Sequence, residues 1–423
     1  MDKIKIDLIS VPFSGHLYPL LTLAEPLLHE ENYQIRVITG DRKIELVEKI
    51  GFSALPILPD HPGKMEEIAN TDMKISALGM LRQFRQVTQL LPEAMQELKK
   101  IWQADRPDIV IADFVTVVAG IVCEELGIPW ITTIPTPFAI ESRTSTPSYL
   151  GGLKPSQTVY GKIRDMAGRS LIHGFKRMAF ALFRRNLGEY QNFKIYDEHG
   201  YERIYSPHSI LALGMKELEF RDDFPAQLRW VGYRCRSFER VETELSITGQ
   251  PGRKKVLVTC GTHLLWEKQN LMEMAKLLGR KYPDMDFWVS LGNCDARDRP
   301  VVFKAKNVRV YEYLPYEQIL PEVDYVFHHG GAGILYHCIE YGKPALIMPR
   351  DYDQFDYAVR AEMAGIARIC KKGDYLGMLK SFEELIRQKD WPELKALQAR
   401  SHQYQSTKVL KNEIERLRPR PFR

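Results

Sequence analysis

One stretch, from Val326 to Gln354, limits the folds that this 423-residue chain can adopt. It opens with an apolar run, continues as HHGGAG from His328, and then places apolar residues at helical spacing. A Gly and a Pro end that helical pattern, and a second apolar run follows at 345–349. The order strand, glycine turn, helix and strand predicts one βαβ unit of a parallel sheet.

The glycine turn of this unit is a candidate anion site. Glycines let the backbone approach a ligand closely, and a helix beginning near Ala332 directs free N–H groups outward. His329 could donate a ring N–H to a phosphate oxygen, while Asp353 and Gln354 follow the next strand and suit sugar hydroxyls. A plain tight turn is the alternative, because GGAG is not the dinucleotide signature GxGxxG.

The ordered motifs HHGGAG, GKP and P-x-x-x-DQ resemble the donor-binding signature of family 1 glycosyltransferases. These GT-B enzymes include UDP-glycosyltransferases and bacterial antibiotic and carotenoid glycosyltransferases, and VRVYEYLP (308–315) extends the similarity upstream. The resemblance implies an α/β fold with two doubly wound, Rossmann-like domains that face each other across a cleft. It also implies a nucleotide-diphosphate sugar as co-substrate, without a cofactor.

Composition fits this expectation. The length suffices for two domains, and 44% hydrophobic with 27% charged residues is typical of a soluble globular protein. No run of 18 apolar residues and no signal-peptide layout occurs, and the six cysteines are scattered without C-x-x-C, which predicts a cytoplasmic protein with reduced thiols. The net charge of +5 does not indicate nucleic-acid binding.

Strands alternate with helices along both halves of the chain, which predicts a parallel sheet in each. We expect an acceptor-binding domain at 1–234, a linker at 235–254, a nucleotide-sugar domain at 255–403, and a helix and tail at 404–423 returning to the first domain. In the first half the expected strands are 5–11, 34–39, 54–58, 108–114 and 130–134, and the expected helices are 17–28, 44–50, 72–102 with a break near Pro92, and 117–126.

His16 and Asp113 are the candidate catalytic pair. His16 follows the first strand and Asp113 ends a later one, and the carboxyl ends of parallel strands share one crevice. A histidine can take a proton from an alcohol near neutral pH, and a carboxylate can fix its tautomer; helix capping is the alternative role for both residues. Because FSGHLYP is similar to the family's P-x-x-G-H-x-x-P element, the resemblance assigns His16 as base and Asp113 as its partner.

The resemblance also assigns the donor site. Thr262 would face the diphosphate, Tyr313 would stack on the base, and the backbone after Tyr313 would hydrogen-bond that base. Two positions depart from the family: Ile334 replaces a common Ser or Thr and offers only its N–H, and His337 replaces an acidic ribose ligand of plant-type relatives. The expected donor-binding set is Thr262, Tyr313, Leu314, His329, Gly330, Gly331, Gly333, Ile334, His337, Asp353 and Gln354.

Two further features leave alternatives open. Asp351 and Asp353 form a D-x-D triplet, a metal motif of another glycosyltransferase fold, but Asp353 belongs to the DQ pair and we expect no metal. The stretch 154–185 carries eight basic residues and one acid, Asp165, with apolar residues along one helical face. It fits a solvated helix packed on its domain, contact with an anionic membrane surface, or contact with a hydrophobic acceptor.

These observations predict an inverting glycosyltransferase that moves a hexose from a UDP- or dTDP-sugar to a hydroxyl of a small natural product or lipid. The expected acceptor is small and hydrophobic or aromatic. A nucleotide-sugar 2-epimerase shares the two-domain architecture and is the second enzymatic interpretation. A non-catalytic protein that binds a sugar nucleotide is the third.

Overall fold

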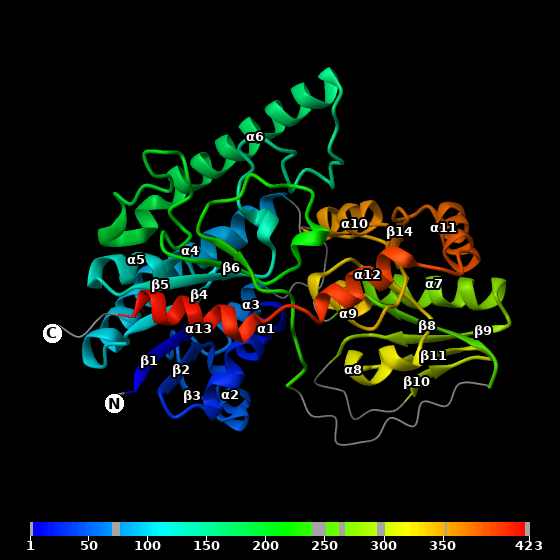
Figure 1. The fold of residues 1–423 in the computed structure, drawn as a ribbon, viewed down its shortest axis with the longest axis horizontal. Coiled ribbons are helices and arrows are strands. Elements are labelled where there is room, and N and C mark those ends of the chain that lie inside the picture. The colour runs from blue at the N-terminus through cyan, green and yellow to red at the C-terminus, as the bar shows by residue number, and fades with distance from the viewer. Residues whose placement is uncertain are drawn as a thin grey trace.

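The computed structural model describes residues 3–69, 77–238, 251–261, 267–293, 301–351 and 353–418. It has two α/β domains, each built on a seven-stranded sheet packed by helices (Figure 1). The predicted fold class is confirmed, because both sheets are doubly wound and lie in two halves of one chain.

The first sheet is wholly parallel, with the order β3-β2-β1-β4-β5-β6-β7. Its central strands are apolar and buried along nearly their whole length, as expected of strands covered on both faces. The strands, numbered along the chain from β1 to β7, are Ile4–Ile9, Tyr33–Thr39, Ser53–Pro56, Ile109–Asp113, Trp130–Ile134, Ile210–Ala212 and Leu228–Trp230. The α-helices of this half are α1 (Ser14–Ala24), α2 (Ile44–Ile50), α3 (Lys64–Ala69), α4 (Ala77–Ala104), α5 (Val117–Leu126) and α6 (Val159–Phe183).

The second sheet has the order β10-β11-β9-β8-β12-β13-β14, and its edge strand β10 pairs antiparallel with β11. The strands, numbered along the chain from β8 to β14, are Lys254–Thr259, Met285–Ser290, Val301–Lys304, Val308–Tyr311, Tyr325–His328, Ala345–Ile347 and Ala367–Ile369. The helices, α7 to α13, are Lys268–Lys281, Tyr316–Ile319, Ala332–Glu340, Gln354–Met363, Tyr375–Arg387, Pro392–Ser401 and Ser406–Leu417.

Helix α4 differs from its prediction. It runs through Pro92 without a break, although proline removes a backbone donor and crowds the carbonyl one turn earlier. The residues after the proline, Met95, Leu98 and Trp102, are buried in the core beside α5. Tertiary packing of this face therefore holds the helix together where local propensity would interrupt it.

The C-terminal segment crosses back to the first domain. Helix α13 packs against α1, and its Leu410 and Ile414 belong to the core of the first sheet. Ser406 Oγ donates to the carbonyl of Val231 at 2.5 Å, and Arg416 donates to the carbonyl of His208 at 2.8 Å. Of the expected linker 235–254, residues 239–250 lie outside the described ones, while β8 begins at Lys254.

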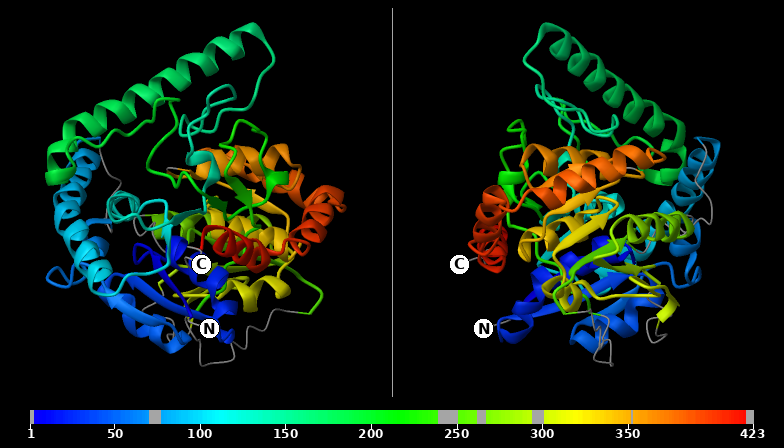
Figure 2. Two further views of the ribbon diagram at one scale, coloured as in Figure 1. Left: turned by 60° about the vertical axis from the view of Figure 1, so that its left-hand side comes forward. Right: turned by 90° about the vertical axis from the view of Figure 1, so that its right-hand side faces the viewer.

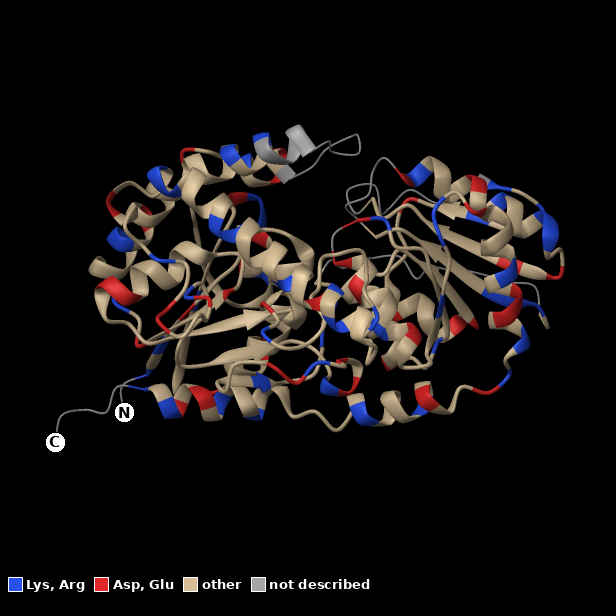
Figure 3. Ribbon diagram, turned by 90° about the horizontal axis from the view of Figure 1, so that it is seen from above, with Lys and Arg blue, Asp and Glu red and all other residues tan. Residues whose placement is uncertain are grey.

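The strand order reverses at the centre of each sheet, between β1 and β4 in the first and between β8 and β12 in the second. Ligands of open α/β sheets bind outside the carboxyl ends of the strands at such switch points. The two domains lie side by side in Figure 1 and overlap in the turned views of Figure 2. Basic and acidic residues are interspersed over both domains (Figure 3).

Candidate active site

The first switch point carries His16 and Asp113. His16 lies in the first turn of α1, directly after β1, and Asp113 is the last residue of the neighbouring strand β4. The ring Nδ1 of His16 lies 3.0 Å from Asp113 Oδ2 and 3.2 Å from Asp113 Oδ1. The carboxylate is fully buried and also accepts the N–H of Val115 at 3.2 Å. Because a carboxylate only accepts, Nδ1 carries the proton and Nε2 is left as the basic atom.

The electrostatics of His16 couple the two domains. Burial alone would lower the pKa of His16, but attraction to Asp113, the hydrogen bond to Asp113 and attraction to Asp353 together raise the pKa above its ordinary value. Asp353 stands at the start of α10 in the second domain. The imidazole therefore responds to a carboxylate from each sheet.

Asp353 belongs to the seam between the domains. Burial raises its pKa to about 6, against the lowering effects of the Thr136 hydroxyl and of His16. Thr136 Oγ1 donates to Asp353 Oδ2 at 3.3 Å and comes from the loop after β5. A carboxyl poised between two domains is suited to accept hydroxyl hydrogen bonds from a ligand that enters there.

The second switch point carries the glycine turn. Strand β12 ends at His328, whose Nδ1 accepts the N–H of Gly330 at 3.0 Å, and Gly331 caps α9 without a side-chain bond. Burial lowers the pKa of His328 well below its ordinary value, so this ring is neutral. The first N–H groups of α9, at Gly333 and Ile334, have no acceptor within the helix, and its dipole adds positive potential there. The turn can therefore hold an anion.

Glycine is required where the turn approaches its neighbours. A Cβ on Gly331 would lie 2.5 Å from His329 Nε2, and one on Gly261, after β8, would lie 2.8 Å from His329 Cε1. Gly330 has a φ of +93°, and a Cβ there would meet the carbonyl of Gln354 at 3.0 Å. His329 thus lies between the turns that follow β8 and β12. The sequence predicted only its place at the second of these turns.

Gln354 does structural work as well. Its Oε1 accepts the N–H groups of Arg350 at 2.9 Å and Asp351 at 3.2 Å. The side chain is almost buried, and these bonds fix the turn that presents Asp353. From the sequence we expected Gln354 to bind only the sugar, and nothing in the DQ motif signalled this second role.

Three further predicted donor residues, Tyr313, Leu314 and His337, belong to the described part of the second domain. Leu314 N–H already donates to Ser290 Oγ at 3.1 Å, which leaves its carbonyl for a base, and Tyr313 Oη lies 3.5 Å from Ser237 Oγ. His337 is buried, with Nδ1 3.4 Å from Glu340 Oε2. Thr262 lies outside the described residues.

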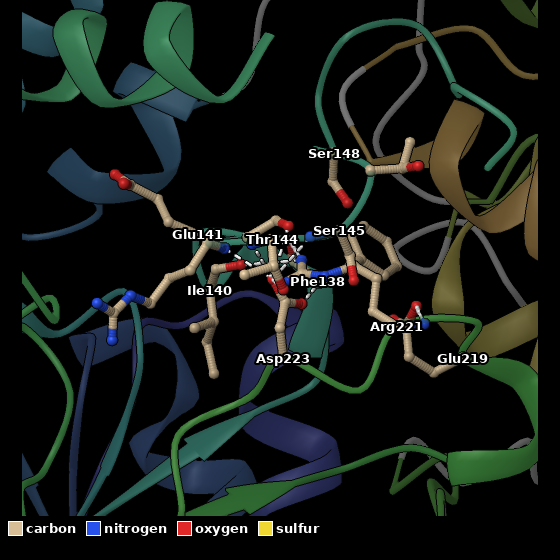
Figure 4. Close-up of polar contacts among 12 residues, drawn as sticks. Phe138, Ile140, Glu141, Thr144, Ser145, Ser148, Glu219, Arg221 and Asp223 are labelled. Carbon is tan, nitrogen blue, oxygen red and sulfur yellow. Dashed lines mark hydrogen bonds and ion pairs between the residues drawn. The ribbon is translucent and has the colours of Figure 1, made fainter. Parts of the chain in front are cut away.

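The loop after β5, residues 135–150, forms the wall of the first domain that faces α10. Asp223 Oδ2 accepts N–H groups from Arg143, Thr144 and Ser145 and the hydroxyl of Ser142, at 2.7 to 3.1 Å (Figure 4). Burial alone would raise the pKa of Asp223, but Arg221 and these donors hold the pKa below its ordinary range. Arg221 also donates to the Ile140 carbonyl at 3.0 Å. An irregular loop is thereby fixed in one conformation.

Helix α10 contacts that loop and the segment around Glu219. Arg360 donates to both carboxylate oxygens of Glu219, at 2.9 and 3.0 Å, between the rings of Phe138 and Phe220. Tyr149 N–H donates to Asp356 Oδ2 at 2.8 Å. These buried interdomain pairs join residues about 140 to 210 positions apart in the chain, and no local pattern predicted them.

A cavity of about 420 Å³ lies elsewhere in the first domain, between α6 and the 140–143 loop. Glu141, His173 and Tyr201 are among its lining residues, which include none of the predicted site residues. We therefore do not assign this cavity to the donor or to the base. No helix in the described part of the chain is long and apolar enough to cross a bilayer.

Known proteins are similar to this chain in sequence and in fold. The family described as the erythromycin biosynthesis protein CIII-like C-terminal domain matches residues 286–388. UDP-glucosyltransferase A1 of Starmerella bombicola is 25% identical over 97% of this chain and 92% of its own. The 4′-demethylrebeccamycin synthase of Lentzea aerocolonigenes is 25% identical over 87% of this chain and 88% of its own.

A solved structure, the glycotransferase of kitacinnamycin, superposes with a TM-score of 0.74 at 19% identity over 99% of this chain and 100% of its own. At that identity the superposition supports the fold, and the relative from Starmerella bombicola is a glycosyltransferase by name. The chain is a glycosyltransferase of the GT-B fold, related to family 1.

Proposed function

We propose that the enzyme transfers a hexose, with inversion, from a UDP- or dTDP-sugar to a hydroxyl of a small natural product or lipid. The observation that carries the proposal is the pairing of the two switch points: an imidazole–carboxylate pair after β1 and β4, and a glycine turn after β8 and β12. The relatives named a UDP-glucosyltransferase and a rebeccamycin synthase support the donor and the acceptor class.

The base acts first at the acceptor. His16 Nε2 removes the proton from the acceptor hydroxyl as its oxygen attacks the anomeric carbon from the face opposite the diphosphate. The bond from that carbon to the diphosphate oxygen breaks, and the nucleoside diphosphate leaves with the electron pair. Buried Asp113 stabilises the imidazolium that forms. Because the attack comes from the face opposite the diphosphate, an α-linked donor gives a β-linked product.

The departing diphosphate is stabilised by the second domain. Backbone N–H groups at Gly331 and Gly333, the start of α9 and the ring of His329 all lie at the turn after β12. Preorganised donors aimed at developing charge lower the barrier without reorganisation. Asp353 would accept hydrogen bonds from sugar hydroxyls, and Gln354 would hold Asp353 in place.

The stereochemistry of the product tests this mechanism. Donors are first screened by thermal shift and acceptors by mass gain, and the product is then examined by proton NMR. An α-donor should give a β-glycoside, with the large coupling between axial protons for a gluco sugar. A product that retains the α configuration would contradict the proposal.

A donor-only control separates the alternatives. Incubation of UDP-N-acetylglucosamine without acceptor should leave the sugar configuration at C2 unchanged. Conversion to the C2 epimer would instead identify an epimerase.

A further inference from the structure

Helix α6 carries an exposed apolar surface that the transfer reaction does not use. Among the described residues, 16 large hydrophobic side chains are exposed, and eight of them lie on this 25-residue helix. Their exposed fractions run from 56% to 80%. They are Val159, Tyr160, Ile163, Met166, Leu171, Phe175, Met178 and Leu182.

The amphipathic order of α6 is reversed relative to an ordinary surface helix. Three of its polar side chains face the protein: Asp165 accepts from Thr146 at 2.6 Å, Arg169 donates to the Ser145 carbonyl at 2.8 Å, and His173 lies 3.0 Å from Glu141. The exposed apolar residues recur at three- and four-residue spacing from Tyr160 to Met166 and again from Leu171 to Leu182. A surface helix normally buries its apolar stripe, so an exposed one marks a contact surface.

The exposed charges of the helix and of the residues directly after it are basic. Lys162 and Arg177 are exposed within the helix, and Arg184 and Arg185 follow it, whereas Lys154 before the helix is paired with Glu362 Oε2 at 2.5 Å. Between residues 154 and 188 the one acidic residue, Asp165, is buried. Like charges on a second copy would repel this rim, whereas anionic lipid headgroups complement it.

The position of α6 permits contact along its whole length. It lies at the outer margin of the ribbon in Figure 1 and in both views of Figure 2. Twenty-five residues span about 37 Å, enough for several lipid headgroups. We propose that α6 binds the surface of an anionic bilayer, with its apolar side chains among the acyl chains and its basic residues at the headgroups.

Vesicle sedimentation tests this proposal, which does not depend on the catalytic one. The full chain is incubated with vesicles of phosphatidylcholine alone or with added phosphatidylglycerol, at low and high salt. We expect binding to the anionic vesicles that weakens with salt. The pair Leu171→Ser and Phe175→Ser, and separately Lys162→Glu with Arg177→Glu, should each reduce the partition coefficient about tenfold or more.

Matched changes on another exposed helix serve as the control. Leu376 and Lys380 lie on α11 of the second domain and are exposed, so Leu376→Ser with Lys380→Glu should leave vesicle binding unchanged. Circular dichroism and unfolding temperature verify that each variant folds. No binding by the wild-type chain, equal binding by the α6 variants, or a concentration-dependent dimer that these variants dissolve would overturn the proposal.

Discussion

His16 is the proposed base, and the pKa of its ring depends on its neighbours. The hydrogen bond to buried Asp113 places its proton on Nδ1, and the two nearby carboxylates raise its pKa against the effect of burial. Transfer needs the neutral ring, so kcat/KM should rise with pH through that raised pKa. The acidic limb of the profile is therefore expected above pH 6.5, the ordinary value.

Asp113→Asn tests that assignment at the residue scale. Loss of the carboxylate removes the largest influences that raise the pKa of His16, so the acidic limb should move to lower pH. The plateau rate should also fall by about 10²- to 10⁴-fold, because the imidazolium loses its partner. The measurement is a pH profile of kcat/KM. An acidic limb at the same pH as in the wild type would show that Asp113 does not set the pKa of the base.

Asp353→Asn should have opposite effects on stability and on activity. Since the folded pKa of Asp353 is raised to about 6, its contribution to stability is present below the ordinary pKa of 3.8 and lost as the pH rises through 6. At pH 8 the amide should therefore stabilise the ligand-free protein by up to about 3 kcal/mol, an upper limit because the side chain keeps some exposure.

The Asp353→Asn difference is measured by denaturant unfolding at pH 5 and pH 8. The gain should shrink at pH 5, and the KM for the donor sugar should rise at both pH values. A variant less stable than wild type at pH 8 would show that the interactions made by the Asp353 carboxylate outweigh the cost of burying its charge.

At the scale of elements, the turn from β12 into α9 depends on the absence of side chains. Gly331→Ala would place a methyl group 2.5 Å from His329 Nε2, which must then move. We expect nucleotide affinity to fall about tenfold or more, since the anion site loses its geometry. Calorimetric titration measures this, with exposed Gly174→Ala of α6, which has open space around it, as the control. Equal affinity in both variants would contradict the role of the turn.

The elements that the sequence predicted well are those with local signals. Helix α5 ends at Leu126 because Gly127 adopts a left-handed φ of +62°, and its boundaries match the prediction. Helix α4 was predicted with a break at Pro92 because propensity is local, whereas the packing that preserves it is not. The antiparallel edge strand β10 carried no distinct pattern.

The site residues likewise divide into those that local signals predict and those that depend on tertiary contacts. His16, Asp113 and the glycine turn follow strands, so topology alone brings them to the two switch points. The Thr136 hydroxyl beside Asp353, the capping role of Gln354 and the Arg360–Glu219 pair depend on how the domains meet. Their sequence separations reach 217 residues, beyond any periodicity or motif.

At the scale of the whole molecule, the seam between the domains rests on buried charge. Arg360 is 2% exposed and paired with Glu219. Arg360→Met should destabilise the protein by about 3–5 kcal/mol, because Glu219 is left buried without its partner. Adding Glu219→Leu should recover much of that loss. Denaturant unfolding of the wild type, the single variant and the double variant measures these differences in stability. A single variant as stable as wild type would show that this pair does not stabilise the contact between the domains.

The central claim is that His16 acts in the chemistry while the second domain alone holds the nucleotide. His16→Ala tests it directly, by calorimetric titration with the nucleoside diphosphate and by product formation with the donor and acceptor found in screening. We expect nucleotide affinity within about twofold of wild type and a rate lowered by about 10³-fold or more. Transfer at the wild-type rate, or loss of nucleotide binding in a folded variant, would contradict it.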